Sequence, residues 1–256
     1  MSTTDSMTGG RAVQNHHTTE LIVALDYPKP DKAFELIDQL KGLPVIYKVG
    51  SELFLHGGPD LVRELVHRKS RVFLDLKFHD IPNTVAKAAR QAALLQVEMF
   101  TLHLAGGRVM VKAVAEELEA IPTLKPKILG VTVLTSFDDV QWAEVTRALT
   151  SHAVDVGESV TGLVEHAPTW GCDGIVCSAF ELKAIRKLYP GLYTVVPGIR
   201  PAGTLADDQH RVMTPAQAHR EGAHAIVMGR PITQASDPRA MAESVLKELP
   251  VQAVSA

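Results

Sequence analysis

Short β-branched segments alternate with longer amphipathic segments from Leu21 onward, and this alternation restricts the fold more than any other feature of the chain. Eight segments have the length and composition of strands, at residues 21–25, 45–49, 71–76, 99–104, 127–134, 174–177, 193–196 and 225–228. Eight helical patterns follow them in turn, at residues 31–40, 59–68, 84–95, 107–119, 155–167, 179–188, 215–221 and 237–249. Strands and helices in regular alternation predict a parallel sheet covered by helices.

The number of these units predicts the architecture. Eight strand–helix units in a chain of 256 residues indicate an α/β fold, a single (β/α)8 TIM barrel over residues 19–256. An open doubly wound sheet is the alternative, which is weakened because no G-x-G-x-x-G motif follows the first strand. Two longer stretches, residues 135–151 and 197–213, interrupt the pattern and are predicted to be loops that gate a ligand.

Charge and composition exclude several classes of function. A net charge of -3 and a pI near 6.4 provide no basic field for nucleic acid or an anionic membrane. No apolar run approaches the ~20 residues of a membrane span, and residues 1–18 lack the apolar core of a signal peptide, so we interpret them as a disordered lead. Cys172 and Cys177 have no second pair to complete a zinc site and are expected to be reduced packing residues. A cytoplasmic protein is expected.

Charged residues gather where the first three predicted strands end. Asp26 follows the first strand, Lys48 lies near the end of the second, and Asp75, Lys77 and Asp80 lie at the end of the third. In a barrel, these ends meet at the rim that holds the active site. Any one of these residues could be a solvated strand end or half of a surface salt bridge. Together they predict a catalytic array, in which a lysine between two aspartates stays protonated and can act as an acid.

The loops after the seventh and eighth predicted strands have the features of a phosphate site. Arg200 follows the seventh strand, and Gly229 and Arg230 follow the eighth. Barrels often hold phosphate at these two loops, because a glycine lets backbone N–H groups approach an anion and an arginine can grip it with two donors. Arg200 could equally be an arginine in an exposed turn. The predicted ligand is a phosphate monoester.

The histidines do not indicate a metal site. The chain contains no H-E-x-x-H motif and no histidine pair at ligand spacing beside a free carboxylate cluster. His79 and His103 lie at strand ends and could line a pocket, but hydrogen-bonded structural histidines are the favoured interpretation. No metal is expected.

Residues 75–84 read Asp-Leu-Lys-Phe-His-Asp-Ile-Pro-Asn-Thr, and this segment closely resembles the signature of the orotidine 5'-phosphate decarboxylase family. The similarity extends over residues 21–246 and looks like the bacterial form. It includes the segments Ala24-Leu25-Asp26, Lys48-Val49-Gly50, Gly130 to Ser136, Val196 to Arg200 and Gly229-Arg230-Pro231. The resemblance implies conversion of orotidine 5'-phosphate to UMP in pyrimidine synthesis, without a cofactor or a metal.

The same resemblance implies roles for individual residues. Lys77 would be the proton donor, and Asp75 the carboxylate that faces the leaving CO₂. The other implied roles are ribose binding and support of the charged array for Asp26 and Lys48, pyrimidine contact for Thr135, and phosphate binding for Gln209, Gly229 and Arg230 with Arg200 alongside. A homodimer is also implied, whose sites are completed by Asp80, Ile81 and Thr84 of the partner chain.

Two other functions stay open. A metal-dependent decarboxylase or aldolase of the 3-keto-gulonate 6-phosphate type shares an Asp-x-Lys-x-x-Asp core but lacks the continuation from Ile81 to Thr84. A non-catalytic barrel that binds nucleotide phosphates would be favoured by a broken Asp-Lys-Asp array, and the array here is intact.

Overall fold

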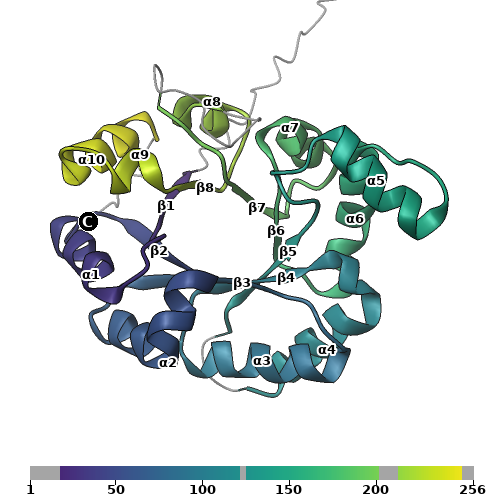
Figure 1. Ribbon diagram of the computed structural model, residues 1–256, viewed down its shortest axis with the longest axis horizontal. Coiled ribbons are helices and arrows are strands. Elements are labelled where there is room, and N and C mark those ends of the chain that lie inside the picture. Colours follow the sequence, from purple (N-terminus) through teal and green to yellow (C-terminus); the bar gives the residue numbers. More distant parts are fainter. Residues whose placement is uncertain (1–17, 122–124, 202–212, 250–256) are drawn as a thin grey trace, which may run out of the picture.

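The strands of the protein form a closed parallel barrel. The computed structural model describes residues 18–121, 125–201 and 213–249. Within these ranges each strand pairs with the next, and β8 (Ala225–Met228) pairs in parallel with β1 (Glu20–Ala24). Figure 1 shows the strands around the centre of the molecule and the helices outside them. The predicted TIM barrel is confirmed, and the open-sheet alternative is wrong because the first and last strands pair with each other.

The elements lie close to their predicted positions. The remaining strands are β2 Val45–Gly50, β3 Arg71–Phe78, β4 Met99–His103, β5 Lys127–Val131, β6 Gly174–Val176 and β7 Tyr193–Val196. The helices are α1 Pro30–Gln39, α2 Ser51–His67, α3 Pro82–Leu94, the 3-10 helix η1 Leu104–Gly106, α4 Gly107–Glu119, α5 Asp139–Thr150, α6 Val156–Trp170, α7 Ala179–Leu188, α8 Pro215–Arg220, α9 Arg230–Thr233 and α10 Pro238–Glu248. The fifth strand ends three residues earlier than predicted, at Val131.

Alternating strand residues face two apolar layers. In β1, Leu21 and Val23 belong to the layer between strands and helices, whereas Ile22 and Ala24 belong to the barrel interior. The interior layer contains Ile22, Ala24, Ile46, Phe73, Met99, Leu129, Val195, Ala225 and Val227. Four of these residues, Ala24, Phe73, Val195 and Val227, also line the main cavity. The barrel is therefore a packed core that forms the floor of a cavity, not a pore.

Helix α5 overturns the prediction of a loop at residues 135–151. It begins with a capping box, in which the Asp138 carboxylate accepts from the Gln141 backbone N–H and the Gln141 side chain accepts from the Asp138 N–H. Thr146 is its one buried residue. The helix therefore lacks the apolar stripe by which amphipathic helices are recognised.

Helix α2 also begins earlier than predicted, at Ser51 instead of residue 59. Gly58 has φ of 59° and ψ of -162°, which are not helical values, so it separates the first turns from the segment that begins at Pro59. The predicted helix is the second of these two pieces.

The amino ends of the strands are joined by ionic and hydrogen bonds. Arg71 of β3 donates to Glu98 from Nε at 2.6 Å and to Glu20 from Nη2 at 2.6 Å. The Tyr193 hydroxyl also donates to Glu20, at 2.5 Å. These contacts tie β1, β3 and β7 together at the mouth of the barrel that lies opposite the predicted active site.

Both cysteines behave as packing residues. Cys172 and Cys177 are buried free thiols, and burial raises the pKa of Cys172 to about 12, so its thiol stays protonated. In the described part of the chain, no helix is long and apolar enough to cross a bilayer.

Gly174, the first residue of β6, is expected to be intolerant of a side chain. A Cβ at this position would lie 2.3 Å from the backbone oxygen of Tyr193 and 2.9 Å from Leu129 Cδ2. We expect Gly174→Ala to lower the free energy of unfolding by about 1–3 kcal/mol, because the neighbouring backbone must move. Gly191→Ala is the control, since a Cβ there meets nothing within 4 Å. Thermal unfolding checks both variants, and equal melting temperatures would contradict the expectation.

Candidate active site

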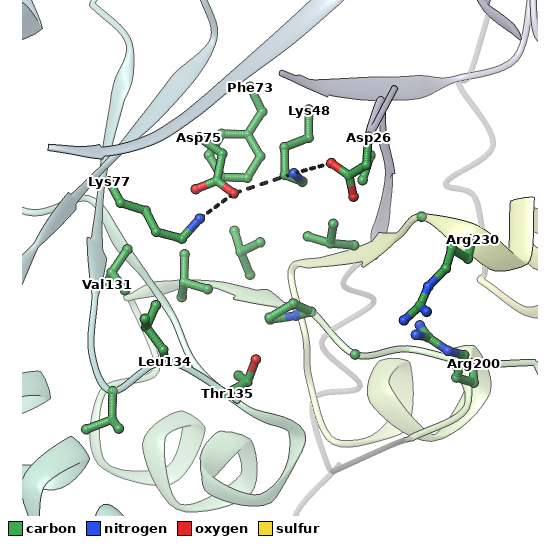
Figure 2. Close-up of a pocket in the computed structure, with 18 of the residues that line it drawn as sticks. Asp26, Lys48, Phe73, Asp75, Lys77, Val131, Leu134, Thr135, Arg200 and Arg230 are labelled. Atoms are coloured by element: carbon green, nitrogen blue, oxygen red, sulfur yellow. Dashed lines mark hydrogen bonds and ion pairs between the residues drawn. The ribbon is translucent and has the colours of Figure 1, made fainter. Parts of the chain in front are cut away.

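Four charged side chains form a row at the carboxyl ends of the first three strands. Lys48 Nζ donates to Asp26 Oδ1 at 3.1 Å and lies 3.6 Å from Asp75 Oδ2. Asp75 Oδ2 also accepts from Lys77 Nζ at 2.9 Å. Figure 2 shows the resulting order of carboxylate, ammonium, carboxylate and ammonium along one side of the cavity. It is Lys48, and not Lys77, that lies between two carboxylates of this chain.

The middle of the row is buried and the ends are open. The side chains of Lys48 and Asp75 are each 12% exposed, that of Lys77 is 37% exposed and that of Asp26 is 61% exposed. Burial alone would raise the pKa of Asp75. The charges of Lys48 and Lys77, with hydrogen bonds from Lys77 and Thr101, outweigh burial and hold the pKa of Asp75 below its ordinary value. Asp75 is therefore an anion at neutral pH, in contact with two ammonium groups.

Lys77 owes its position to an irregularity in β3. Leu74 pairs with Phe100 of β4 and Phe78 pairs with Leu102, so four steps along β3 correspond to two steps along β4. Within this bulge Lys77 has a φ of 51°, in the left-handed region that non-glycine residues seldom occupy. Such a conformation costs on the order of 1–3 kcal/mol and persists only where the surrounding contacts hold it.

Thr101 of β4 supplies one of these contacts. Its hydroxyl oxygen accepts from the Lys77 backbone N–H at 2.9 Å, and its hydroxyl donates to Asp75 Oδ1 at 2.9 Å. The side chain is fully buried. Sequence reasoning missed Thr101, and the one available signal was a polar residue between the apolar residues Phe100 and Leu102 of a strand.

Gly50, at the end of β2, leaves room for the row. A Cβ at this position would lie 3.3 Å from Lys48 Nζ and 3.7 Å from Asp26 Oδ1. In the sheet, Gly50 is the register partner of Asp75. A larger residue would therefore press on the ammonium at the centre of the row.

The row faces a cavity of about 460 Å³, a size in the range of small-molecule sites. Thr135, Arg200, Gly229 and Arg230 also line it. In Figure 2 the two arginine side chains point toward each other, across the cavity from Lys77. The Arg200 residue is only 9% exposed, so it is not the exposed turn residue of the alternative interpretation. Its backbone N–H donates to the Met213 oxygen at 3.0 Å.

Three predicted site residues lie outside this cavity. Asp80 accepts from the Ile81 backbone N–H at 2.6 Å, and neither a hydrogen bond nor an ion pair joins it to Lys77. Ile81 is 67% exposed, and Asp80 and Thr84 are also exposed. Gln209 lies outside the described residues. Within one chain, the cavity is therefore built without Asp80, Ile81 and Thr84.

The two histidines near the row also lie outside the cavity. The rings of His79 and His103 lie against each other, with centroids 5.3 Å apart. Burial, and then the charges of His79 and Lys77, lower the pKa of His103, so it is neutral at physiological pH. Across residues 18–121, 125–201 and 213–249, no group of three or more His, Cys, Asp or Glu residues could hold a metal ion.

Comparison with known proteins adds to this geometry. The family model described as "Orotidine 5'-phosphate decarboxylase / HUMPS family" matches residues 19–245. The chain belongs to this family. The resemblance drawn from residues 75–84 and the assignment to a family of carboxy-lyases are thereby confirmed.

Named members of the orotidine 5'-phosphate decarboxylase family are similar over nearly the whole chain. An orotidine 5'-phosphate decarboxylase of Legionella pneumophila (strain Corby) is 48% identical over 233 residues, which is 91% of this chain and 100% of the relative. One from Pseudomonas syringae pv. syringae (strain B728a) is 45% identical over 231 residues, 90% of this chain and 97% of the relative. The crystal structure of orotidine 5'-phosphate decarboxylase from Lactobacillus acidophilus matches with a TM-score of 0.78 and 37% identity, covering 90% of this chain and 98% of that one.

Proposed function

We propose that the protein is a cytoplasmic, cofactor-independent enzyme that decarboxylates orotidine 5'-phosphate to UMP and CO₂ in pyrimidine synthesis, with Lys77 as the proton donor. The observation that carries the proposal is the row from Asp26 to Lys77 on one side of a cavity that has two arginines on the other. The named relatives at 44–48% identity support the choice of substrate.

The chemical problem is the charge left on the ring. Loss of CO₂ from C6 of the pyrimidine leaves a carbanion in the ring plane, where no conjugated group can accept the electron pair. Stabilisation must therefore be electrostatic. The Lys77 ammonium, held 2.9 Å from Asp75, places positive charge where negative charge develops and then transfers a proton to C6.

Asp75 fixes the Lys77 ammonium and also lies beside the position proposed for the substrate carboxylate. Its buried anion disfavours the carboxylate of the bound substrate more than the neutral CO₂ that leaves. Lys48 keeps the row balanced, because it contacts both Asp26 and Asp75. Asp26, at the open end of the row, and Lys48 are placed to bind ribose hydroxyls.

The phosphate occupies the other side of the cavity. Arg200 and Arg230 line the side of the cavity across from Lys77, and each guanidinium can offer two parallel N–H donors to a phosphate. We assign Arg200, Arg230 and the Gly229 N–H group to the phosphate, together with Gln209, and Thr135 to the pyrimidine. Contacts this far from C6 provide binding energy that positions the reacting carbon against Lys77.

The direct test is a spectrophotometric assay with purified, metal-stripped protein. We expect the ultraviolet absorbance of orotidine 5'-phosphate to change as UMP forms, with the same rate in the presence of a chelator. Activity that requires an added divalent metal would favour the phosphosugar decarboxylase or aldolase of the same superfamily. Tight binding of UMP without turnover would favour a non-catalytic barrel.

We also propose that the enzyme is a homodimer with shared sites. Asp80, Ile81 and Thr84 are exposed at the end of β3 and the start of α3, next to Lys77 in the sequence but outside the cavity of their own chain. Ile81 is 67% exposed, and contact with a partner chain would remove this apolar side chain from water. In the dimer, these residues would reach the site of the partner.

Arg230→Ala is expected to weaken substrate capture. Loss of charge-assisted hydrogen bonds of about 1.5–3 kcal/mol should lower kcat/KM for orotidine 5'-phosphate by roughly 10- to 100-fold. With orotidine, which has no phosphate, the variant and the wild type should be equally slow. Arg147→Ala, an exposed arginine of α5, is the matched control. An unchanged kcat/KM would show that the phosphate assignment is wrong.

A further inference from the structure

The hydroxyl of Thr101 connects the two catalytic residues of β3. It lies in the neighbouring strand, accepts from the Lys77 N–H at 2.9 Å and donates to Asp75 Oδ1 at 2.9 Å. Because a hydroxyl has one proton and a backbone N–H can only donate, the direction of both bonds is determined. The Thr101 proton must point at Asp75.

The bond to Asp75 sets the orientation of its carboxylate. Oδ1 is occupied by Thr101, and Oδ2 faces Lys77 at 2.9 Å and Lys48 at 3.6 Å. If the Thr101 donor were removed, the carboxylate could rotate and Oδ2 would leave its place between the two ammonium groups. The row would keep its charges but lose its geometry.

The bond to Lys77 holds the backbone where it is least regular. The ladder between β3 and β4 is interrupted between Leu74 and Phe78, so a side chain takes the place of a strand partner for the Lys77 N–H. Lys77 also has a left-handed φ of 51°. A buried N–H without an acceptor is costly, and the bulge would relax to find one. The direction in which the lysine side chain leaves the backbone would then change.

We propose that Thr101 is a positioning residue for the decarboxylation, which acts through its hydroxyl by fixing the Asp75 carboxylate and the Lys77 backbone together. The inference rests on the proposed function and assigns a role to a residue that does not line the cavity. Thr101 itself touches no substrate. Its effect is on the placement of the acid, and so on the rate of the chemical step.

Three variants, compared with the wild type, separate the hydroxyl from the methyl group at this position. Thr and Val have nearly the same shape and differ by the hydroxyl, and Ser and Ala differ by the hydroxyl without the methyl. We expect Thr101→Val to lower kcat for orotidine 5'-phosphate by roughly 10- to 100-fold, the loss typical of a misplaced catalytic group. The kcat of Thr101→Ser should stay within about threefold of the wild-type value. The kcat of Thr101→Ala should be lower than that of Thr101→Ser by the same factor that separates Thr101→Val from the wild type.

Other readouts distinguish positioning from a loss of structure. KM and the Kd for UMP should stay within about threefold in all four proteins, because the phosphate and ribose contacts are unchanged. Thr194→Val is the control for removal of a buried strand hydroxyl: Thr194 is fully buried in β7 and its hydroxyl contacts His224 Nδ1 at 3.0 Å, away from the cavity. This variant should keep the wild-type kcat.

Different results would contradict the role of Thr101 and the proposed function. The role of Thr101 would be overturned if the wild type and Thr101→Val had equal kcat values, or if Thr101→Ser and Thr101→Ala did. It would also be overturned if the substitutions raised KM and left kcat unchanged. If Thr101→Val does not fold, the Ser and Ala pair makes the same comparison. A wild type that does not turn over orotidine 5'-phosphate would overturn the proposed function itself, whereas an active wild type with equal pairs would overturn the positioning role alone.

Discussion

Lys77→Ala is expected to lower kcat for orotidine 5'-phosphate by about 10⁴-fold or more, because one side chain supplies both the proton and the positive charge opposite the carbanion. Asp75 would lose its closest cation, which lies at 2.9 Å. The phosphate and ribose contacts would remain, so UMP should still bind measurably. Single-turnover absorbance measurements give the rate, and calorimetry gives the affinity for UMP.

Two further substitutions sharpen this result. Lys77→Arg keeps a positive charge but cannot release a proton near neutral pH, so it should also be inactive if proton transfer is required. Lys183→Ala removes an exposed lysine of α7 and should leave turnover unchanged. A folded Lys77→Ala protein within about tenfold of the wild type would rule out the lysine as the acid.

A heterodimer of a Lys77→Ala chain with an Asp80→Ala chain is expected to recover about half of the wild-type activity, since one of its two sites would be native. The homodimer of each variant should have a lowered kcat. For Asp80→Ala we expect a loss of roughly 10²- to 10³-fold, because the Asp80 carboxylate would no longer stabilise the transition state electrostatically. The reason is geometric: Asp80 has no ion pair with Lys77 of its own chain, and Ile81 beside it is 67% exposed. The assay requires two affinity tags, so that only the mixed dimer is purified.

The control places both substitutions in one chain and pairs it with a wild-type chain. If Asp80 acts on the partner's site, this dimer has no native site and should be nearly inactive. If Asp80 acts within its own chain, the pattern reverses: the first heterodimer is inactive, and the control retains about half of the activity. A monomer in sedimentation at assay concentration would also contradict the shared site.

The barrel could be predicted from the sequence because its strands and helices differ in length and in hydrophobic period. The strands are short apolar segments whose side chains alternate every two residues, whereas apolar residues in the helices recur about every 3.6 residues. Helix α5 could not be predicted in this way. It depends on its cap at Asp138 and buries Thr146 alone, so its residues have no apolar stripe. The break in α2 at Gly58 likewise depends on a backbone conformation, and a glycine in the sequence permits that conformation without requiring it.

The charged row was predictable in part. Alternation at strand ends indicates that Asp26, Lys48, Asp75 and Lys77 meet at one rim, and they do. The order of contacts was not predictable, because it depends on the register of neighbouring strands and on the bulge in β3. For the same reason the sequence marks Thr101 only as a polar residue within β4 and does not indicate that it lies opposite this bulge.

The irregular third strand limits how this chemistry could be transplanted by design. A designer who copied the four ionisable side chains onto an idealised barrel would start from strands with uninterrupted pairing, in which every second residue points inward at a fixed spacing. The extra length of β3 between Leu74 and Phe78 would be missing. The lysine side chain would then leave the backbone at a different height and angle. A successful graft must therefore reproduce the irregular pairing of β3 with β4, and the threonine that supports it, before the reactive groups are added.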